Sequence, residues 1–171
     1  GGAGNPETKD GDYVTSYLWK DVLQKDSLLD ILQKFVNFEV KKEKTVLEDG
    51  TYKEVTKKSL IFPRYHQMDA VRKLVKDVRE HGPGKNYLIQ HSAGSGKSNS
   101  IAWTAYRLAS LHNDKNEPVF TSVVIVTDRT VLDQQLQDTI SGFDHTLGSV
   151  VTIDEKKNSK GLRDALNDGK R

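Results

Sequence analysis

Residues 90–100 read QHSAGSGKSNS, and this stretch decides the fold class that the sequence predicts. Its closing Gly-Lys-Ser is typical of a phosphate-binding loop, in which successive backbone N–H groups surround an anion at the N-terminus of a helix. Gly94 and Gly96 hold the inner positions, where a side chain would obstruct the anion. The position that usually opens the pattern with glycine is His91, but there the chain leaves a strand and a side chain can be accommodated. We therefore expect a strand, a phosphate loop and a helix in succession.

The loop offers three kinds of group to a nucleotide. We expect its backbone to surround the phosphates, the Lys97 amine to approach the β and γ phosphates as the catalytic cation, and the Ser98 hydroxyl to bind Mg²⁺. The cofactor-binding residues predicted in the loop are Ala93, Gly94, Ser95, Gly96, Lys97 and Ser98. The alternative is an ordinary strand-to-helix turn that carries an exposed lysine. The position of the motif between an apolar run and a helix favours the nucleotide site.

The flanks of the loop alternate between strand and helix patterns. The expected strands are residues 87–89, 123–126 and 149–153, of which the second is a continuous β-branched run. The expected helices carry the apolar stripe of residues 68–78, the buried face of residues 101–111, the apolar positions 131–136 after a Thr127-Asp128 cap, and residues 162–166. Alternation at this spacing predicts right-handed βαβ units, and therefore an α/β domain with a parallel sheet and flanking helices.

The segment before residue 63 has a different pattern. Residues 13–40 show apolar positions at helical spacing, with Asp26 or Ser27 placed to cap the helix. In residues 41–58, two polar–apolar stretches flank Asp49-Gly50, which is a hairpin signal. A solvated lysine-rich hairpin is the simpler interpretation of that stretch, and a DNA-contacting ribbon is the alternative. The predicted organisation is a disordered lead at 1–12, a helical linker plus hairpin at 13–62, and the N-terminal part of a phosphate-loop domain at 63–171.

Composition excludes several classes of protein. The chain has 171 residues, no cysteine and a net charge of +2, so it forms no disulfides or thiolate metal sites, and its charge alone indicates no nucleic-acid partner. The longest aliphatic run, residues 123–126, is far shorter than the roughly 20 apolar residues of a membrane span. The first ten residues contain no apolar stretch of the kind found in a secretory signal. We expect a soluble, cytoplasmic protein without a membrane partner.

A second motif, FPRYHQ at residues 62–67, lies ahead of the loop. A glutamine carboxamide offers a donor and an acceptor side by side, which match N6–H₂ and N7 of adenine. Arg64-x-x-Gln67 resembles the glutamine motif of superfamily 2 helicases and translocases, so we expect Arg64 and Gln67 to join the ATP site. A surface glutamine on the first turn of a helix is the alternative.

A third stretch, SVVIVTDRTVLDQQL at residues 122–136, delivers polar residues from a buried strand to the start of a helix. Helicase-type motors carry a nucleic-acid contact one strand–helix unit after the phosphate loop. We expect Thr127, Asp128 and Arg129 to bind a nucleic-acid phosphate there without reading its base. The alternative, that Thr127 and Asp128 only cap the helix, does not exclude this contact.

These stretches, in this order and spacing, resemble the restriction (motor) subunit of type I restriction–modification enzymes. The similarity rests on PRYHQ, IQHSAGSGKS and VVIVTDRTVLDQQL, extends to YVTSYLWKDVLQKDSLLDILQKFVNFEV, and runs from about Tyr13 to Ile153. In that family a histidine near the front of the phosphate loop is usual, as at His91. The resemblance implies a RecA-like motor domain, ATP and Mg²⁺ as cofactors, translocation and cleavage of double-stranded DNA, and methylase and specificity subunits as partners.

The chain differs in several features from the complete restriction subunits of that family. The segment before residue 63 has no room for a nuclease signature. Asp154-Glu155 is followed by a helical pattern, whereas the acidic Mg²⁺ motif of the family should come one strand later. We expect the chain to be the front half of the first motor domain with its preceding linker, and to have little ATPase activity alone. The alternatives are another superfamily 2 motor, a small phosphate-loop kinase, and a nucleotide-binding module without hydrolysis.

Overall fold

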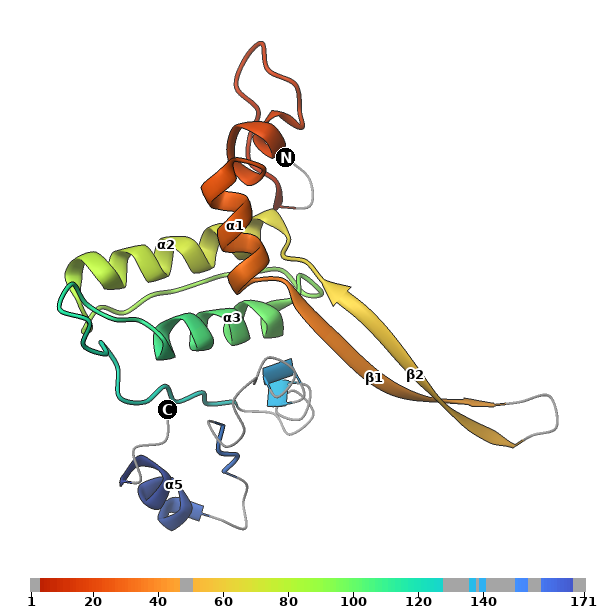
Figure 1. Ribbon diagram of the computed structural model, residues 1–171, viewed down its shortest axis with the longest axis vertical. Coiled ribbons are helices and arrows are strands. Elements are labelled where there is room, and N and C mark those ends of the chain that lie inside the picture. The colour runs from red at the N-terminus through yellow and green to blue at the C-terminus, as the bar shows by residue number, and fades with distance from the viewer. Residues whose placement is uncertain are drawn as a thin grey trace.

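The computed structural model describes residues 4–46, 51–127, 136–137, 139–140, 150–153 and 158–167. The elements in chain order are a π-helical turn η2 (Leu18–Val22), α1 (Lys25–Lys34), β1 (Asn37–Val46), β2 (Tyr52–Ile61), α2 (Tyr65–His81), α3 (Lys97–Ala109) and α5 (Asn158–Asn167). Helices α2 and α3 pack on each other, α1 crosses them near the start of α2, and the hairpin β1–β2 projects away from this body (Figure 1). No helix in the described part of the chain is both long and apolar enough to cross a membrane.

The hydrophobic core joins the front of the chain to the phosphate-loop region. Its buried members are Val22, Ile31, Phe35, Met68, Val71, Val75, Val78, Trp103 and Leu111. Phe35 is fully buried, and its ring lies 5.6 Å from the ring of Trp103. The Trp103 indole N–H donates to the Phe35 carbonyl at 2.8 Å, which satisfies two buried polar groups at once. Helix α1 is therefore part of the same core as α2 and α3.

A carboxylate between two arginines strengthens this packing. Asp30 on α1 accepts from Arg72 of α2 at 2.9 Å and from Arg107 of α3 at 3.2 Å. Both guanidinium groups also lie over the Phe35 ring, at 5.7 and 4.9 Å from its centroid. The three charged side chains are mostly shielded from solvent, so their attraction is less screened than in an exposed ion pair. One residue of α1 thus holds both helices that flank the phosphate loop.

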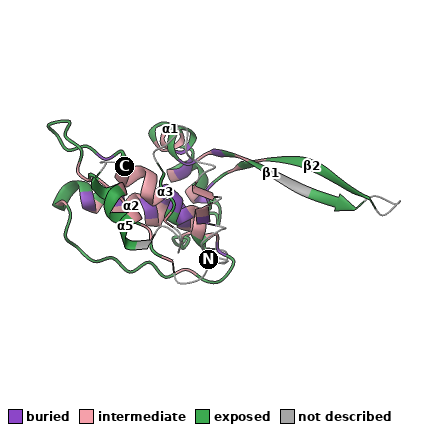
Figure 2. Cartoon of the chain, turned by 90° about the horizontal axis from the view of Figure 1, so that it is seen from below, coloured by how far each residue is buried: buried purple, intermediate pink, exposed green. Residues whose placement is uncertain are grey.

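The hairpin predicted around Asp49-Gly50 is confirmed. β1 and β2 pair antiparallel, from Asn37 opposite Ile61 to Val46 opposite Tyr52. The turn residues 47–50 lie outside the described residues. Most of the described hairpin is exposed, as Figure 2 shows, because two strands alone have no second layer to cover them.

The parallel sheet predicted around the phosphate loop is not shown. In the part of the chain that the structure describes, the one sheet is the antiparallel pair β1–β2. Residues 87–89 and 123–126, predicted as strands, are irregular segments, as are residues 150–153, the described part of the strand predicted over 149–153. A strand requires a neighbouring strand for its ladder of hydrogen bonds, and no described segment supplies one beside these three. Their apolar composition, which suggested a buried sheet, therefore does not by itself produce strand pairing.

The helix predictions are confirmed with two corrections. α2, α3 and α5 contain the expected stripes, and α2 ends before Gly82 as predicted. The helical stretch predicted over 13–40 is wrong beyond Lys34, because residues 37–40 belong to β1. The predicted cap at Asp26 or Ser27 is also wrong, since the N-cap position of α1 is Gln24, whose side chain makes no capping hydrogen bond. The helix predicted after the Thr127-Asp128 cap falls mostly outside the described residues.

Candidate nucleotide-binding site

The phosphate-loop motif lies where the sequence predicts it, immediately before α3. Gly96 is the N-cap of α3 and has φ 82°, and Gly94 has φ 71°. Both angles lie in the left-handed region, which glycine adopts without the steric cost that other residues carry. The two glycines thus turn the chain from the segment after α2 into the first turn of α3. The first N–H groups of that turn have no carbonyl partner within the helix, so they are suited to an anion.

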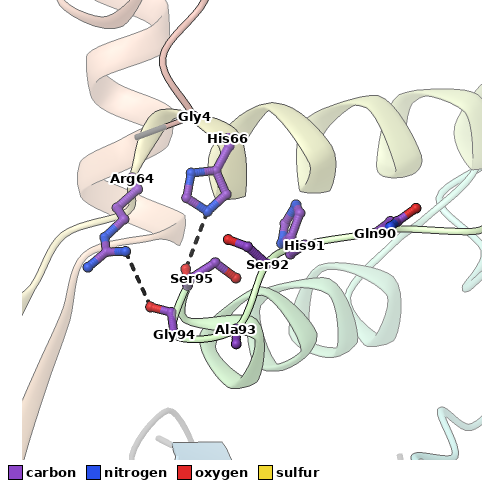
Figure 3. Close-up of a pocket in the computed structure, with 9 residues that line it drawn as sticks. All are labelled: Gly4, Arg64, His66, Gln90, His91, Ser92, Ala93, Gly94 and Ser95. Atoms are coloured by element: carbon purple, nitrogen blue, oxygen red, sulfur yellow. Dashed lines mark hydrogen bonds between the residues drawn. The ribbon is translucent and has the colours of Figure 1, made fainter. Parts of the chain in front are cut away.

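The first turn of α2 hydrogen-bonds the outer side of this loop. Gln67 Nε2 donates to the carbonyl oxygens of Ser95 at 3.2 Å and Gly96 at 2.8 Å. Arg64 Nη1 makes a longer contact of 3.5 Å with the Gly94 carbonyl (Figure 3). Gln67 Oε1 also accepts from the backbone N–H of Arg64 at 2.9 Å, which satisfies the N-cap amide at the start of α2. The structure therefore brings both predicted residues of the second motif, Arg64 and Gln67, to the loop.

Close packing between Gln67 and the loop gives Gly96 a second reason to be glycine. A Cβ atom at Gly96 would lie 2.5 Å from Gln67 Nε2, too close for atoms that are not bonded. Gln67 is only 3% exposed, so its carboxamide has little room to retreat. A Cβ at Gly94 would meet nothing within 4 Å. Position 94 thus favours glycine because of its positive φ alone. Position 96 favours glycine because of its positive φ and because Gln67 leaves no room for a Cβ atom.

Lys97 is folded back against the loop in this structure. Its Nζ donates to the Ser92 carbonyl at 2.9 Å and lies 3.5 Å from the His91 carbonyl. The residue is otherwise exposed, so the amine can exchange these carbonyls for a phosphate without disturbing the core. The position of Lys97 at the first residue of α3 places the cation beside the free N–H groups of the helix.

Two histidines face each other beside the loop. The rings of His66 and His91 make an edge-to-face contact with centroids 4.9 Å apart. Burial lowers the pKa of His91, and the nearby His66 and Lys97 lower it further. His91 thus packs at the opening position of the motif on a residue from α2, and it leaves the glycines at the inner positions unobstructed.

A cleft of about 400 Å³ lies between the start of α2 and the loop. Figure 3 shows the lining residues, which are Gly4, Arg64, His66, Gln90, His91, Ser92, Ala93, Gly94 and Ser95. Ser95 is 7% exposed, and its Oγ has no hydrogen-bond partner in the described structure. A buried hydroxyl without a partner is costly unless a ligand or water satisfies it. This unpaired group, the adjacent Lys97 cation and the glycine cradle fit a bound phosphate.

The remaining predicted residues are placed only in part. Ser98 is half-buried on the first turn of α3, where its hydroxyl is available to a cation bound beside the phosphates. No cluster of acidic and histidine residues suited to a metal occurs among the described residues. Thr127 lies half-buried in an irregular segment, while Asp128 and Arg129 fall outside the described residues. The structure therefore brings together the predicted ATP-site residues, but it does not place the predicted nucleic-acid contact.

Sequence reasoning missed His66. Its Nε2 lies 3.3 Å from the Ser95 carbonyl, the same oxygen that accepts from Gln67. The available signal was its place inside Arg64-x-x-Gln67, which sets it one residue from the predicted adenine contact. Pattern alone could not show that the ring turns toward the loop rather than toward solvent.

Comparisons with known proteins identify a matching family and similar sequences. The SWI2/SNF2 ATPase family matches residues 66–171, more than half of the chain. The type I restriction enzyme HindI endonuclease subunit of Haemophilus influenzae is 32% identical over 124 residues, covering 72% of this chain and 11% of that protein. The putative type I restriction enzyme MjaVIIIP endonuclease subunit of Methanocaldococcus jannaschii is 27% identical over 147 residues, covering 78% of this chain and 13% of that protein.

These matches confirm the resemblance to endonuclease subunits of type I restriction enzymes. The chain spans only about a tenth of the length of either relative. No solved structure matches the chain.

Proposed function

We propose that this chain, which belongs to the SWI2/SNF2 ATPase family, binds ATP and Mg²⁺ as part of a DNA-translocating motor. One observation carries the nucleotide part of the proposal. The first turn of α2 holds the carbonyls of Ser95 and Gly96, while the N-terminus of α3 leaves N–H groups for an anion. A loop held in this way is organised before any ligand arrives, and binding then requires little further ordering of the backbone.

Three groups of the loop have separate roles in the proposal. The N–H groups from Ala93 to Ser98 surround the phosphates, and the Lys97 amine moves from the Ser92 carbonyl to the β and γ phosphates. The Ser98 hydroxyl binds Mg²⁺, which supplies charge neutralisation when it is present. Lys97 is the catalytic cation, since it can stabilise charge that develops on the transferred phosphoryl group.

In the proposal Gln67 discriminates adenine from guanine through its acceptor alone, whereas the sequence suggests that both its donor and its acceptor contact the base. Its Nε2 hydrogens are engaged by two loop carbonyls, and its Oε1 accepts one bond from Arg64. The remaining lone pair of Oε1 can accept from the adenine N6–H₂ group. Guanine presents the acceptor O6 at that position, so two acceptors would oppose each other.

The motor part of the proposal rests on the relatives. Both relatives described above are named as endonuclease subunits of type I restriction enzymes. By analogy, we infer that the whole protein translocates and cleaves double-stranded DNA with methylase and specificity subunits, and that residues 127–129 contact a DNA phosphate. In this proposal residues 13–62 form the linker with its hairpin, and residues 63–171 the first part of a RecA-like domain.

The exposed apolar segments support the parallel sheet of that domain. Leu88 is 93% exposed and Val126 is 87% exposed, although both belong to apolar runs of the kind that parallel sheets bury. We infer that residues 87–89 and 123–126 become strands when neighbouring strands pair with them. Pairing would bury these side chains and satisfy their backbone groups together.

The decisive experiment is a titration of the chain with a fluorescent ATP analogue, MANT-ATP, in the presence of Mg²⁺. We expect saturable binding that Lys97→Ala weakens by roughly tenfold or more, because a charge-assisted contact to phosphate is lost. Lys76→Ala is the matched control, since this lysine pairs with Glu80 on the exposed face of α2. Equal affinities for the two variants would contradict the proposal.

Measuring ATP hydrolysis distinguishes part of a motor from a module that only binds nucleotide. We expect little ATPase activity from this chain alone, with or without duplex DNA, because hydrolysis also needs a group that orients water. Strong DNA-stimulated hydrolysis by the isolated chain would overturn that expectation. Absence of any nucleotide binding would instead indicate a module in which the loop has only a structural role.

A further inference from the structure

We propose that His66 is a positioning residue for the phosphate loop, a role that rests on the nucleotide site proposed above. His66 Nε2 lies 3.3 Å from the carbonyl oxygen of Ser95 (Figure 3). A carbonyl oxygen only accepts hydrogen bonds, so the ring carries its hydrogen on Nε2 and donates it. The Ser95 carbonyl also accepts from Gln67 Nε2 at 3.2 Å. Two donors from adjacent residues of α2 therefore occupy both lone pairs of one loop oxygen.

Fixing this carbonyl also fixes the neighbouring N–H. In a planar trans peptide the C=O of Ser95 and the N–H of Gly96 point in opposite directions. Since α2 draws the Ser95 oxygen outward, the Gly96 N–H turns away from α2. The Gly96 carbonyl, held by Gln67 at 2.8 Å, turns the N–H of Lys97 away from α2 in the same manner. These are the N–H groups that the proposed phosphate needs, so α2 sets their direction without touching the nucleotide.

Packing keeps the His66 ring in the orientation that this bond requires. The His91 ring lies against it edge to face at 4.9 Å. On the opposite side, the chain at Gly4 approaches so closely that a Cβ there would lie 2.5 Å from His66 Nδ1. Nδ1 is buried without a hydrogen-bond partner in the described structure, so the ring is held by shape and by its single bond to Ser95. His91 thus supports the loop indirectly, through the residue that fixes the Ser95 carbonyl.

Two substitutions separate the hydrogen bond from the packing. His66→Phe keeps a flat ring against His91 but has no donor, whereas His66→Gln places an amide donor near the position of Nε2 without a ring. We expect His66→Phe to weaken MANT-ATP binding about fivefold to tenfold, as for the loss of one hydrogen bond that holds the loop. We expect His66→Gln to bind within about twofold of the parent chain, because the Ser95 carbonyl keeps its second donor.

Hydrogen exchange in the nucleotide-free chain gives a second readout that does not depend on ATP binding. We expect faster exchange of the amides of residues 94–97 in His66→Phe, and exchange like that of the parent chain in His66→Gln. His81→Phe is the matched control, because His81 is an exposed histidine at the other end of α2. Thermal unfolding of each variant checks that the body of the protein is intact.

The outcomes distinguish the two proposals. If the parent chain does not bind MANT-ATP, the proposed function fails, and the exchange of residues 94–97 still tests the role of His66. If His66→Phe matches the parent chain in loop exchange, the positioning role is wrong. A loss in His66→Gln as large as that in His66→Phe would also overturn it, because a donor placed near the position of Nε2 would then restore no binding.

Discussion

The indole N–H of Trp103 reaches the carbonyl of Phe35 at 2.8 Å, although the two residues are 68 positions apart in the chain. This bond crosses from α3 to the end of α1, and both side chains are fully buried. The helix that begins at the phosphate loop is therefore anchored to the front segment of the chain. Substitutions in that segment should consequently act on the same cooperative unit as substitutions in α2 and α3.

Trp103→Phe tests this anchor while keeping an aromatic ring in the core. The variant keeps a large aromatic ring but leaves the buried Phe35 carbonyl without its donor, so we expect a loss of about 1–3 kcal/mol in the free energy of unfolding. Phe35→Ala removes the packed ring and should cost about 3–5 kcal/mol. Urea unfolding followed by circular dichroism measures both. A Phe35→Ala variant as stable as the parent chain would mean that α1 is not part of the core in solution.

Asp30→Asn tests the carboxylate that both arginines share. The variant keeps the size of the side chain but removes the charge that compensates Arg72 and Arg107. We expect a loss of about 1–3 kcal/mol in unfolding free energy, less than for a fully buried pair because these groups retain some solvent contact. Asp69→Asn, which breaks an exposed pair with Lys73, is the control and should change stability by less than about 0.5 kcal/mol.

Gly96→Ala should disturb the loop more than an equivalent change elsewhere. The added Cβ would clash with Gln67 Nε2 in addition to straining the left-handed backbone. We expect MANT-ATP affinity to fall roughly tenfold or more, since the carboxamide must release the loop carbonyls. Gly82→Ala, at a positive-φ glycine after α2 with open space around its Cβ, serves as the control for strain at a glycine outside the loop. Similar affinities in the two variants would contradict the proposed contribution of Gly96 to nucleotide binding.

Gln67→Glu separates nucleotide choice from loop support. The carboxylate keeps an acceptor for adenine N6–H₂ but has no hydrogens for the carbonyls of Ser95 and Gly96. We expect Gln67→Glu to bind nucleotide more weakly overall but to keep the preference for ATP over GTP. Gln67→Ala should lose both the support of the loop and that preference. Competition of ATP and GTP against MANT-ATP gives the ratio of ATP affinity to GTP affinity for each variant. Retained preference in Gln67→Ala would show that another residue reads the base.

Stability at high pH should report on the Tyr65 hydroxyl, which donates to Asp21 at 3.0 Å. Burial and this hydrogen bond raise the pKa of Tyr65 to about 12. A group whose pKa is higher in the folded state stabilises below its unfolded pKa of about 10, and the contribution disappears as the pH rises toward 12. We expect the stability difference between the parent chain and Tyr65→Phe to shrink between pH 10 and 12, as measured by urea midpoints. A difference that is constant with pH would contradict the raised pKa.

The sequence predicted the parts of the structure that depend on local pattern. Glycines at 94 and 96 followed by Lys97 predict the turn into α3, and the apolar stripe with Gly82 predicts the length of α2, because these signals act within one or two helical turns. The Asp49-Gly50 signal likewise predicted which strands pair, although it did not indicate that they extend to Asn37 and Ile61.

Features that depend on distant contacts could not be predicted in the same way. The role of His66 requires the start of α2 to lie against the loop, and the sharing of Asp30 requires three helices to meet. The parallel sheet was predicted from apolar runs, but a strand forms only where another strand pairs with it. The apolar composition of residues 87–89 indicates that they tend to be buried. It does not indicate which segment of the chain lies beside them.

The long separation between Asp30 and its partners has a consequence for biosynthesis. Arg72 follows Asp30 by 42 residues and Arg107 by 77, so α1 is synthesised before either arginine. At about 5–20 residues per second, the wait for Arg107 is on the order of 4–15 seconds. During that interval the apolar face of α1, with Ile31 and Phe35, lacks the part of the core that α3 supplies. The front segment therefore completes its packing only after α3 has been synthesised.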